Sequence, residues 1–321
     1  MVTTLTLNPS LDRTLWIDKL TPGTLHRAAM SREHPSGKGI NISLALHAWG
    51  HPTRICAVVG GRTGRWLREE LERTGIPLEL VECGGETRTN TKVIELSTGR
   101  LTELNEPGPA VSPETAAGLL EAAEKGRKPG SFAALSGSLP PGLPAGTYRT
   151  MIERLRRSGP VALDASGTAL VEGIKGRPDL VKPNVDELEF LIGRALPGME
   201  ERLGGVRRLH ETGVRLVALS MGADGALFSD GERVVWAKSE PVQVKSAVGC
   251  GDVLLAALLF ALERPRDWPG WPERARFAVA AATAAAQQEG TVPPSYADVE
   301  AALARVSVRE GRWVGNLVVD L

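Results

Sequence analysis

The chain has 321 residues, 42% of them hydrophobic, and equal numbers of basic and acidic side chains, 38 of each. This length suffices for a large core, and the balanced charge disfavours nucleic-acid binders, which usually carry a basic excess. The three cysteines, Cys56, Cys83 and Cys250, have neither metal-binding spacing nor the even number of a disulfide framework, which indicates a reducing compartment.

The first residues, 1–8, lack the basic region and apolar stretch of a signal peptide. The longest apolar runs fall short of the ~18 residues that a membrane span needs. We therefore expect a cytoplasmic protein that contacts neither membranes nor nucleic acid.

Short apolar runs typical of β-strands alternate with longer amphipathic segments typical of helices. The expected strands are residues 3–7, 54–58, 92–96, 132–135, 161–163, 180–182, 216–219 and 226–229. The expected helices are residues 40–48, 64–73, 113–125, 145–157, 186–191 and 199–212, with one more, buried helix in the apolar run 253–260. This alternation predicts an α/β fold with a parallel sheet, whose ligands gather at the carboxyl ends of the strands.

Two segments interrupt the alternation, because residues of about 12–34 and 76–106 are rich in strand and turn signals and poor in helix signals. We expect both to form one small β-sheet that projects from the body as a lid or a dimer surface. Residues 263–273, with three prolines, predict a surface connection, and residues 309–321 predict a last strand or a tail. The whole chain, residues 1–321, is expected to be a single domain.

The most informative loop is Gly249-Cys250-Gly251-Asp252, which directly precedes the predicted buried helix. Two glycines allow backbone N–H groups to crowd together at a helix N-terminus, whose unpaired amides and positive dipole end favour anions. An aspartate at this place suits a base that accepts the proton of a substrate hydroxyl beside a phosphate. The alternative is that Asp252 only caps the helix.

A second glycine loop, residues 36–41 with the sequence SGKGIN, opens the helix predicted at 40–48. It lacks the earlier glycine and the following hydroxyl of a P-loop, so it is not a Walker motif. Gly37 permits close approach of the backbone, while Lys38 and Asn41 suit the hydroxyls or phosphate of a small polar substrate. The alternative is a tight turn with an exposed lysine.

Three polar side chains, Arg88, Asn90 and Lys92, alternate along one predicted lid strand and therefore share one face. Three donors on one face suit a phosphorylated sugar, and an exposed lid surface is the alternative. Ser138 belongs to another segment rich in hydroxyls and glycine, residues 136–142, at the carboxyl end of a predicted strand.

The segment Lys182-Pro183-Asn184-x-x-Glu187 follows a further strand. Asn184 and Glu187 lie one helical turn apart, so their oxygens face one side and suit Mg²⁺, directly or through water. The structural alternative makes Asn184 an N-cap and Glu187 its capping-box partner.

The turn at residues 220–225 connects two predicted strands, where backbone can line a nucleotide, although as an isolated signal it indicates only a hairpin. The residues concerned are Ser220, Gly222 and Gly225.

Other reaction classes lack their signals. The five histidines have no metal-binding spacing, and no GxSxG nucleophile elbow is present. A dinucleotide-dependent oxidoreductase is disfavoured because no GxGxxG motif follows the first strand with an acidic residue about 20 positions on.

In chain order, these motifs resemble those of the ribokinase-like, or PfkB, family of sugar kinases. The segments that carry the resemblance are Leu7-Asn8-Pro9-Ser10-x-Asp12, Ser36-Gly37-Lys38-Gly39-Ile40-Asn41, Arg88-x-Asn90-x-Lys92, Thr102-Glu103-Leu104-Asn105-Glu106-Pro107-Gly108, Ser136-Gly137-Ser138-Leu139-Pro140, Asp164-x-Ser166-Gly167, Lys182-Pro183-Asn184-x-x-Glu187, Ser220-x-Gly222-x-x-Gly225 and Gly249-x-Gly251-Asp252. The loop SGKGIN and the segment NEPG are similar to those of phosphosugar kinases rather than nucleoside kinases.

The resemblance implies a three-layer α/β/α sandwich with a mainly parallel central sheet and a small β lid that often mediates formation of a homodimer. It implies ATP-dependent phosphorylation of a phosphosugar, with fructose 1-phosphate as the expected acceptor and fructose 1,6-bisphosphate as the product. Tagatose 6-phosphate or another phosphosugar is the nearest alternative acceptor. A catalytically silent sugar-phosphate sensor on the same fold is a more distant alternative.

The resemblance also implies roles for single residues. Asp252 would be the catalytic base, and the amides of Gly249, Cys250, Gly251 and Asp252 would form the anion hole for the transferred phosphoryl group. The phosphosugar would contact Asp12, Gly37, Lys38, Asn41, Arg88, Asn90 and Ser138. ATP would lie near Lys182, Asn184, Ser220, Gly222 and Gly225. Glu187, together with Asn184, would place Mg²⁺.

The chain departs from the family's usual loop, Thr-Val-Gly-Ala-Gly-Asp-Ser, because Ala247, Cys250 and Val253 replace its threonine, alanine and serine. Backbone N–H groups survive a change of side chain, so the anion hole is expected to persist. The missing hydroxyls are expected to weaken phosphate or nucleotide contacts. The tail after Val308 is also longer than the resemblance implies.

Overall fold

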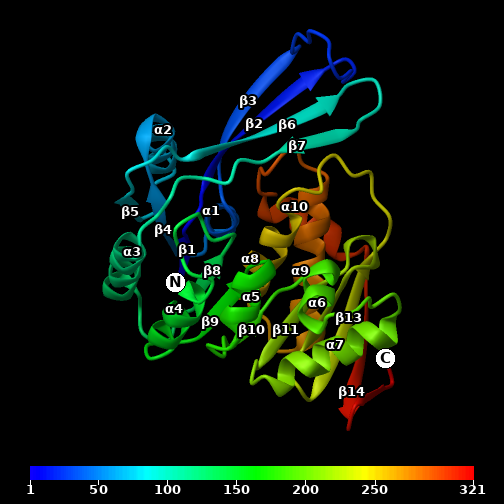
Figure 1. Ribbon diagram of the computed structural model, residues 1–321. Helices are drawn as coiled ribbons and strands as arrows, with labels where there is room; N and C mark the ends of the chain where they lie inside the picture. The colour runs from blue at the N-terminus through cyan, green and yellow to red at the C-terminus, as the bar shows by residue number, and fades with distance from the viewer.

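The computed structural model describes all residues, 1–321, and contains two β-sheets (Figure 1). The larger sheet has eleven strands in the order β15-β14-β13-β12-β11-β10-β9-β8-β1-β4-β5. These are β1 Val2–Thr6, β4 Thr53–Val59, β5 Leu78–Glu82, β8 Ala133–Ser136, β9 Val161–Asp164, β10 Leu180–Val181, β11 Leu216–Ser220, β12 Ala226–Ser229, β13 Arg233–Ser239, β14 Val306–Val314 and β15 Leu317–Val319. The strands from β5 to β11 pair in parallel, and those from β11 to β15 pair antiparallel.

Helices cover both faces of this sheet. One face carries α1 Lys38–Ala48, α2 Gly61–Glu72, α8 Cys250–Leu262, α9 Trp271–Ala286 and α10 Tyr296–Leu303. The other carries α3 Pro113–Gly126, α4 Thr147–Leu155, α5 Gly167–Ile174, α6 Val185–Ile192 and α7 Met199–Glu211. Because strand side chains alternate, Val2 joins the core beneath α8 while Leu5 joins the opposite core. The predicted three-layer α/β/α sandwich with a mainly parallel sheet is confirmed.

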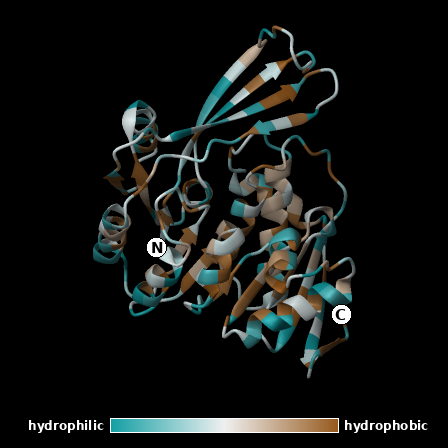
Figure 2. Ribbon diagram, viewed as in Figure 1, coloured by the Kyte–Doolittle hydropathy of each residue, from teal (hydrophilic) through white to brown (hydrophobic).

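Hydropathy follows the layers. Figure 2 shows hydrophobic strands of the large sheet between helices whose outer faces are hydrophilic. Helix α8 is the exception, because all its residues from Asp252 to Ala261 are buried. A helix that is apolar on every side belongs inside a protein, and α8 accordingly packs between the sheet and α1 and α9.

The smaller sheet has four strands in the order β3-β2-β6-β7 and stands apart from the body as a lid (Figure 1). These are β2 Ser10–Ile17, β3 Met30–Ser36, β6 Arg88–Glu95 and β7 Leu101–Leu104. Strand β2 pairs in parallel with β6 and antiparallel with β3. The lid therefore draws its strands from two separated parts of the chain.

One part of the predicted lid lies elsewhere. Residues 76–87 were expected in the lid, but Leu78–Glu82 form β5, which pairs in parallel with β4 at the edge of the large sheet. Each face of β5 contacts a helix: Leu78 and Leu80 pack on the cluster that contains α2, and Val81 packs on the cluster that contains α3. A strand with apolar contacts on both faces fits the body and not a lid that faces solvent.

The remaining boundaries follow from burial. Residues 263–273 were expected to form a surface connection, yet Trp271 is buried and already begins α9. The expected last strand is present, because residues 309–321 complete β14 and form β15.

No helix has the length and apolar character that crossing a bilayer would require.

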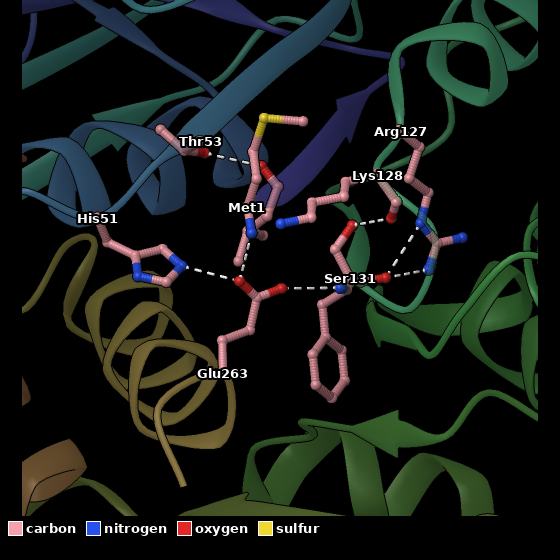
Figure 3. A network of polar contacts seen from close by, with 9 residues as sticks. Met1, His51, Thr53, Arg127, Lys128, Ser131 and Glu263 are labelled. Atoms are coloured by element: carbon pink, nitrogen blue, oxygen red, sulfur yellow. Dashed lines mark hydrogen bonds and ion pairs between the residues drawn. The ribbon is translucent and has the colours of Figure 1, made fainter. Parts of the chain in front are cut away.

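The far end of α8 is held by one carboxylate, Glu263, which follows the helix directly (Figure 3). Its Oε2 contacts the amino group of Met1 at 2.6 Å and Nε2 of His51 at 3.0 Å, and its Oε1 accepts the amide of Phe132 at 2.9 Å. Burial acts to raise the pKa of Glu263, but these hydrogen bonds outweigh it and lower the pKa to about 2. Glu263 thus ties α8 to the starts of β1 and β8.

We expect Glu263→Gln to lower the free energy of unfolding by about 2–4 kcal/mol, because a largely buried carboxylate with several donors is lost. The carboxylate stabilises the fold fully above its ordinary pKa, and this contribution fades as the pH falls toward 2. Urea unfolding at several pH values measures both effects. Glu300→Gln, on the exposed side of α10, is the matched control and should change stability by less than about 0.5 kcal/mol.

Candidate active site

A cavity of about 400 Å³ lies between the lid and the carboxyl edge of the large sheet, and only one of its lining residues is hydrophobic. Most of the residues predicted from the sequence line it: Asp12, Gly37, Lys38, Asn41, Arg88, Asn90, Lys182, Asn184, Glu187, Ser220, Gly249, Gly251 and Asp252. The structure therefore brings together side chains that the motifs placed on separate loops. Parallel strands that end at one edge explain this convergence.

Asp252 lies in the first turn of α8 and is buried. The N-cap of this helix is Gly249, at φ 81°, and no side chain caps it, so the capping alternative for Asp252 is wrong. The first helical hydrogen bond runs from the amide of Val253 to the carbonyl of Gly249, which leaves the amides of residues 250–252 unpaired within the helix. Asp252 instead accepts a hydrogen bond from Nδ2 of Asn41 at 2.7 Å.

The surroundings of Asp252 make its carboxyl group harder to ionise. Burial, and then the negative charge of Asp164, raise its pKa to about 6, while Lys38, Asn41 and Lys182 act in the opposite direction. A carboxyl group with a pKa just below neutrality is ionised at pH 7 and retains affinity for a proton. Both properties suit a general base.

Asp164, the last residue of β9, is fully buried next to two lysines. Its Oδ1 accepts from Nζ of Lys38 at 2.8 Å, and its Oδ2 lies 3.3 Å from Nζ of Lys182. Burial would raise the pKa of Asp164, but the two ammonium groups outweigh burial and hold it below its usual value. Burial would lower the pKa of Lys38, yet Asp164, Glu187 and Asp252 raise it. Both partners therefore stay charged.

Asn184 and Glu187 form the capping box that the sequence left as the structural alternative. The amide of Glu187 donates to Oδ1 of Asn184 at 2.7 Å, and the amide of Asn184 donates to Oε2 of Glu187 at 2.9 Å. The other oxygen of Glu187 points toward Lys38, at 3.8 Å from its Nζ. No group of three or more His, Cys, Asp or Glu side chains is gathered in a metal-binding arrangement.

The lid side of the cavity is built around Asp12. Nζ of Lys92 lies 2.6 Å from Oδ2 of Asp12, and both side chains are almost completely buried. Ser10 and Asn90 donate to Oδ1 of Asp12 at 2.8 and 3.2 Å. The shared strand face predicted that Lys92 would be a free donor for a phosphorylated sugar. Its ion pair with Asp12 shows instead that its charge is already neutralised.

Arg88 is the other cation of the lid side. It donates to the carbonyls of Glu106 and Asn8 at 3.1 and 3.0 Å, and its Nε is buried without a partner. Burial lowers the pKa of Arg88, against the opposing effects of Asp12 and Glu106. These contacts hold the guanidinium group at the wall of the cavity.

Four predicted residues do not line the cavity: Cys250, Ser138, Gly222 and Gly225. The thiol of Cys250 points toward the carbonyl of Ser246 at 3.6 Å and packs against the core, and burial raises its pKa to about 11. Ser138 accepts a hydrogen bond from Nδ2 of Asn8 at 3.1 Å.

The two glycines of the turn 220–225 differ in their surroundings. Gly222 begins a short 3-10 helix, Gly222–Asp224, with open space around its Cα. Gly225 has φ 81°, and a Cβ there would lie 2.1 Å from the carbonyl oxygen of Ala237. The close approach of β13 therefore explains a glycine at position 225.

The structure adds lining residues that the sequence had not singled out as site residues: Ser10, Ser36, Glu103, Asn105 and Val248. Lys92, the third donor of the predicted strand face, also lines the cavity. Ser10 could have been found from strand alternation, because it precedes Asp12 by two residues and shares its face. Asp164 had only a place in a motif, and nothing in the sequence indicated that two lysines would meet it.

Comparison with known proteins agrees with this geometry. Residues 6–297 match the family described as pfkB family carbohydrate kinase. The chain is 36% identical over 299 residues to a 1-phosphofructokinase of Rhodobacter capsulatus, covering 91% of this chain and 93% of the relative. It is 34% identical over 260 residues to a D-tagatose-1-phosphate kinase of Klebsiella oxytoca, covering 81% and 84% of the two chains.

The fold comparison points the same way. The crystal structure of phosphofructokinase-2 from Escherichia coli in complex with substrates and products superposes with a TM-score of 0.89 at 30% identity, covering 94% of this chain and 98% of the other. The matched region includes both the helix N-terminus that carries Asp252 and the lid that carries Asp12. The chain is a member of the pfkB family of carbohydrate kinases, enzymes that transfer a phosphoryl group from ATP to a sugar.

Proposed function

We propose that this kinase phosphorylates a primary hydroxyl of a ketohexose phosphate, with fructose 1-phosphate as its acceptor and fructose 1,6-bisphosphate as its product. The observation that carries the proposal is the arrangement of one cavity with Asp252 at one end and the Asp12, Asn90 and Arg88 group at the other. The relative named 1-phosphofructokinase supports the choice of acceptor.

At the reacting end, Asp252 would accept the proton of the attacking hydroxyl. Its hydrogen bond from Asn41 fixes the carboxylate, and its pKa of about 6 keeps it ionised at neutral pH. The unpaired amides of residues 250–252 and the positive end of α8 would stabilise the charge on the transferred phosphoryl group. Phosphoryl transfer depends mainly on positioning and charge neutralisation, which these groups supply.

On the lid side of the cavity, two buried acceptor atoms have no hydrogen-bond donor. They are Oδ1 of Asn41 and Oδ1 of Asn90, two residues that line the cavity. A buried acceptor without a partner is costly, and sugar hydroxyls are donors of the right kind. Asp12 and Gly37 would also contact the sugar, Arg88 would pair with its phosphate, and Ser138 would act through Asn8.

The nucleotide would lie along Lys182, Asn184 and Ser220, with the turn that contains Gly222 and Gly225 beyond them. Lys182 would face its phosphates. Lys38, which the resemblance assigned to the phosphosugar, would face them as well, because it contacts the same carboxylate, Asp164, as Lys182. Glu187 would supply a ligand for Mg²⁺, because only one of its two carboxylate oxygens takes part in the capping box. Mg²⁺ usually keeps several waters and takes one or two carboxylates together with substrate phosphates, whose charge it neutralises.

A second acceptor has its own support. A relative named D-tagatose-1-phosphate kinase matches over most of the chain, so a tagatose phosphate is the alternative substrate. ADP formation measured with fructose 1-phosphate, fructose 6-phosphate, tagatose 1-phosphate and tagatose 6-phosphate decides between them. The highest kcat/KM for fructose 1-phosphate is expected, and turnover with none of the four would contradict the proposal.

Replacing the base tests the mechanism. Asp252→Asn keeps the shape and the contact with Asn41 but cannot accept a proton, so we expect kcat to fall by about 10²–10⁴. ATP affinity, measured by calorimetry, should stay within a few fold. The kcat/KM of the unsubstituted enzyme should decline as the pH falls through about 6, since Asp252 then becomes protonated. Near-full kcat in the variant would rule out this role.

We also propose that the lid forms a homodimer. Four side chains form an apolar row across its strands, because Trp16 pairs with Met30 and Ile94, and Ile94 pairs with Leu101. The row lies on the same face of the lid as Asp12, because Asp12 and Trp16 are four residues apart on β2. Figure 2 shows hydrophobic segments on β6 and β7. Met30 and Leu101 are 39% and 40% exposed in the single chain. Trp16, inside the row, is only 8% exposed, so the exposed apolar surface lies at the two ends of the row, and exposed apolar surface of this kind marks protein interfaces.

Leu101→Glu places a charge in this row and should convert the expected dimer into a monomer, since burying an unpaired carboxylate is costly. Sedimentation velocity measures the change. Phe190→Glu is the matched control, because Phe190 is 54% exposed on α6, away from the lid. A monomeric unsubstituted protein, or a Leu101→Glu variant that remains dimeric, would contradict the proposal.

The three free cysteines fit a reducing compartment, so we place the enzyme in the cytoplasm.

A further inference from the structure

Asp164 is a buried carboxylate whose surroundings have a direct consequence for the reaction. It has no exposed surface, and it lies between the ammonium groups of Lys38 and Lys182, at 2.8 and 3.3 Å. The two lysines come from different elements, since Lys38 begins α1 and Lys182 follows β10. One carboxylate therefore connects two separate walls of the cavity.

Lys182 occupies an unusual place for a cation. A Cβ at Gly251, in the first turn of α8, would lie 3.3 Å from Nζ of Lys182, so the ammonium group abuts the N-terminus of this helix. A helix N-terminus carries partial positive charge and disfavours a neighbouring cation. The Lys182 side chain is only 4% exposed, so water screens this repulsion little. A negative charge is needed to hold the ammonium group there, and Asp164 supplies it.

We propose that Asp164 is a positioning residue of the phosphoryl-transfer site, whose carboxylate holds the ammonium groups of Lys38 and Lys182 around the N-terminus of α8. The result is an anion site in which backbone amides and two ammonium groups converge. This inference rests on the proposed function, because it assigns the phosphates of ATP to that site.

The charged groups around Asp252 support the proposal that Asp164 positions the two lysines. The groups that face Asp252 are Lys38 from α1, Asp164 from the end of β9, Lys182 from the end of β10 and the thiol of Cys250 on its own helix. Without Asp164, Lys182 would turn toward Asp252, and Lys38 would turn toward Asp252 or toward Glu187, whose Oε1 already lies 3.8 Å from its Nζ. Both ammonium groups would then withdraw from the phosphates. Asp164 therefore also keeps the base free of a direct ion pair.

The first experiment measures binding of ATP with Mg²⁺ in the absence of sugar. Asp164→Asn keeps the shape and one acceptor for Lys38 but removes the charge, so we expect ATP affinity to fall roughly tenfold. The matched control is Asp179→Asn, because Asp179 holds the opposite end of the same strand by accepting the amide of Val161 at 3.0 Å. Asp179 lies outside the cavity, so this control should lower the melting temperature without changing ATP affinity.

The second readout is the pH profile of kcat/KM. Loss of the Asp164 charge removes a repulsion and lets the lysines approach Asp252, and both changes lower the pKa of Asp252. The acidic limb of the profile should therefore move to lower pH in Asp164→Asn. A purely structural role would lower activity without moving the limb.

A double-mutant cycle tests whether Asp164 acts through the lysines. In a chain that already carries Lys182→Met, the further change Asp164→Asn should weaken ATP binding by no more than about threefold, since only Lys38 remains to be positioned. This comparison also serves if the single variant does not fold, because the double variant leaves fewer unpaired buried charges.

Two results would overturn the proposal: unchanged ATP affinity with an unmoved acidic limb in Asp164→Asn, or a full tenfold loss in the Lys182→Met background. The ATP measurements need no acceptor, so they separate this inference from the choice of phosphosugar. An enzyme that binds ATP with the expected losses but phosphorylates none of the four sugars would retain the role of Asp164 and refute the proposed acceptor.

Discussion

Parallel pairing of the strands from β5 to β11 is the constraint on which the rest of the structure depends. Neighbouring parallel strands end at the same edge, so the residues at the ends of β9, β10 and β11, namely Asp164, Lys182 and Ser220, meet there despite their separation in the chain. The buried helix α8 delivers Asp252 to the same edge. The antiparallel strands β12 to β15 extend the sheet sideways and add no lining residue.

Helix α8 carries a carboxylate near each end, and the two have opposite environments. Asp252 is buried beside another negative charge, which raises its pKa to about 6, whereas Glu263 has three donors, which lower its pKa to about 2. The environment of Asp252 therefore lowers the free energy of unfolding at neutral pH, whereas the environment of Glu263 raises it. The proposed role of Asp252 as base would explain why an unfavourable group is kept there, and the contacts of Glu263 at the other end of the helix offset part of its cost.

Much of the fold was predictable because strand and helix periods are local properties of the sequence. Helix α9 was missed because it is rich in alanine and buried on most of its surface, so it shows no amphipathic stripe. The pairing of Asp12 with Lys92 depends on the register between β2 and β6, and no local pattern encodes that register. The contacts of Asp164 with Lys38 and Lys182 could not be predicted for the same reason. Motifs predicted which loops matter, but the partners of each charge depended on tertiary contacts.

The junction between lid and body has a mechanical consequence. Strand β3 of the lid leads through a single residue, Gly37, into the first turn of α1, where Lys38 binds Asp164. Gly37 has φ 133°, and a Cβ there would lie 2.9 Å from Cγ2 of Thr6 and 3.1 Å from Cα of Pro9, so this junction is wedged against the start of the lid. A displacement of the lid would therefore also displace the start of α1 and the ammonium group of Lys38. If binding on the lid side of the cavity moves the lid, it would also move Lys38, and the coupling of the two binding free energies would then be reciprocal.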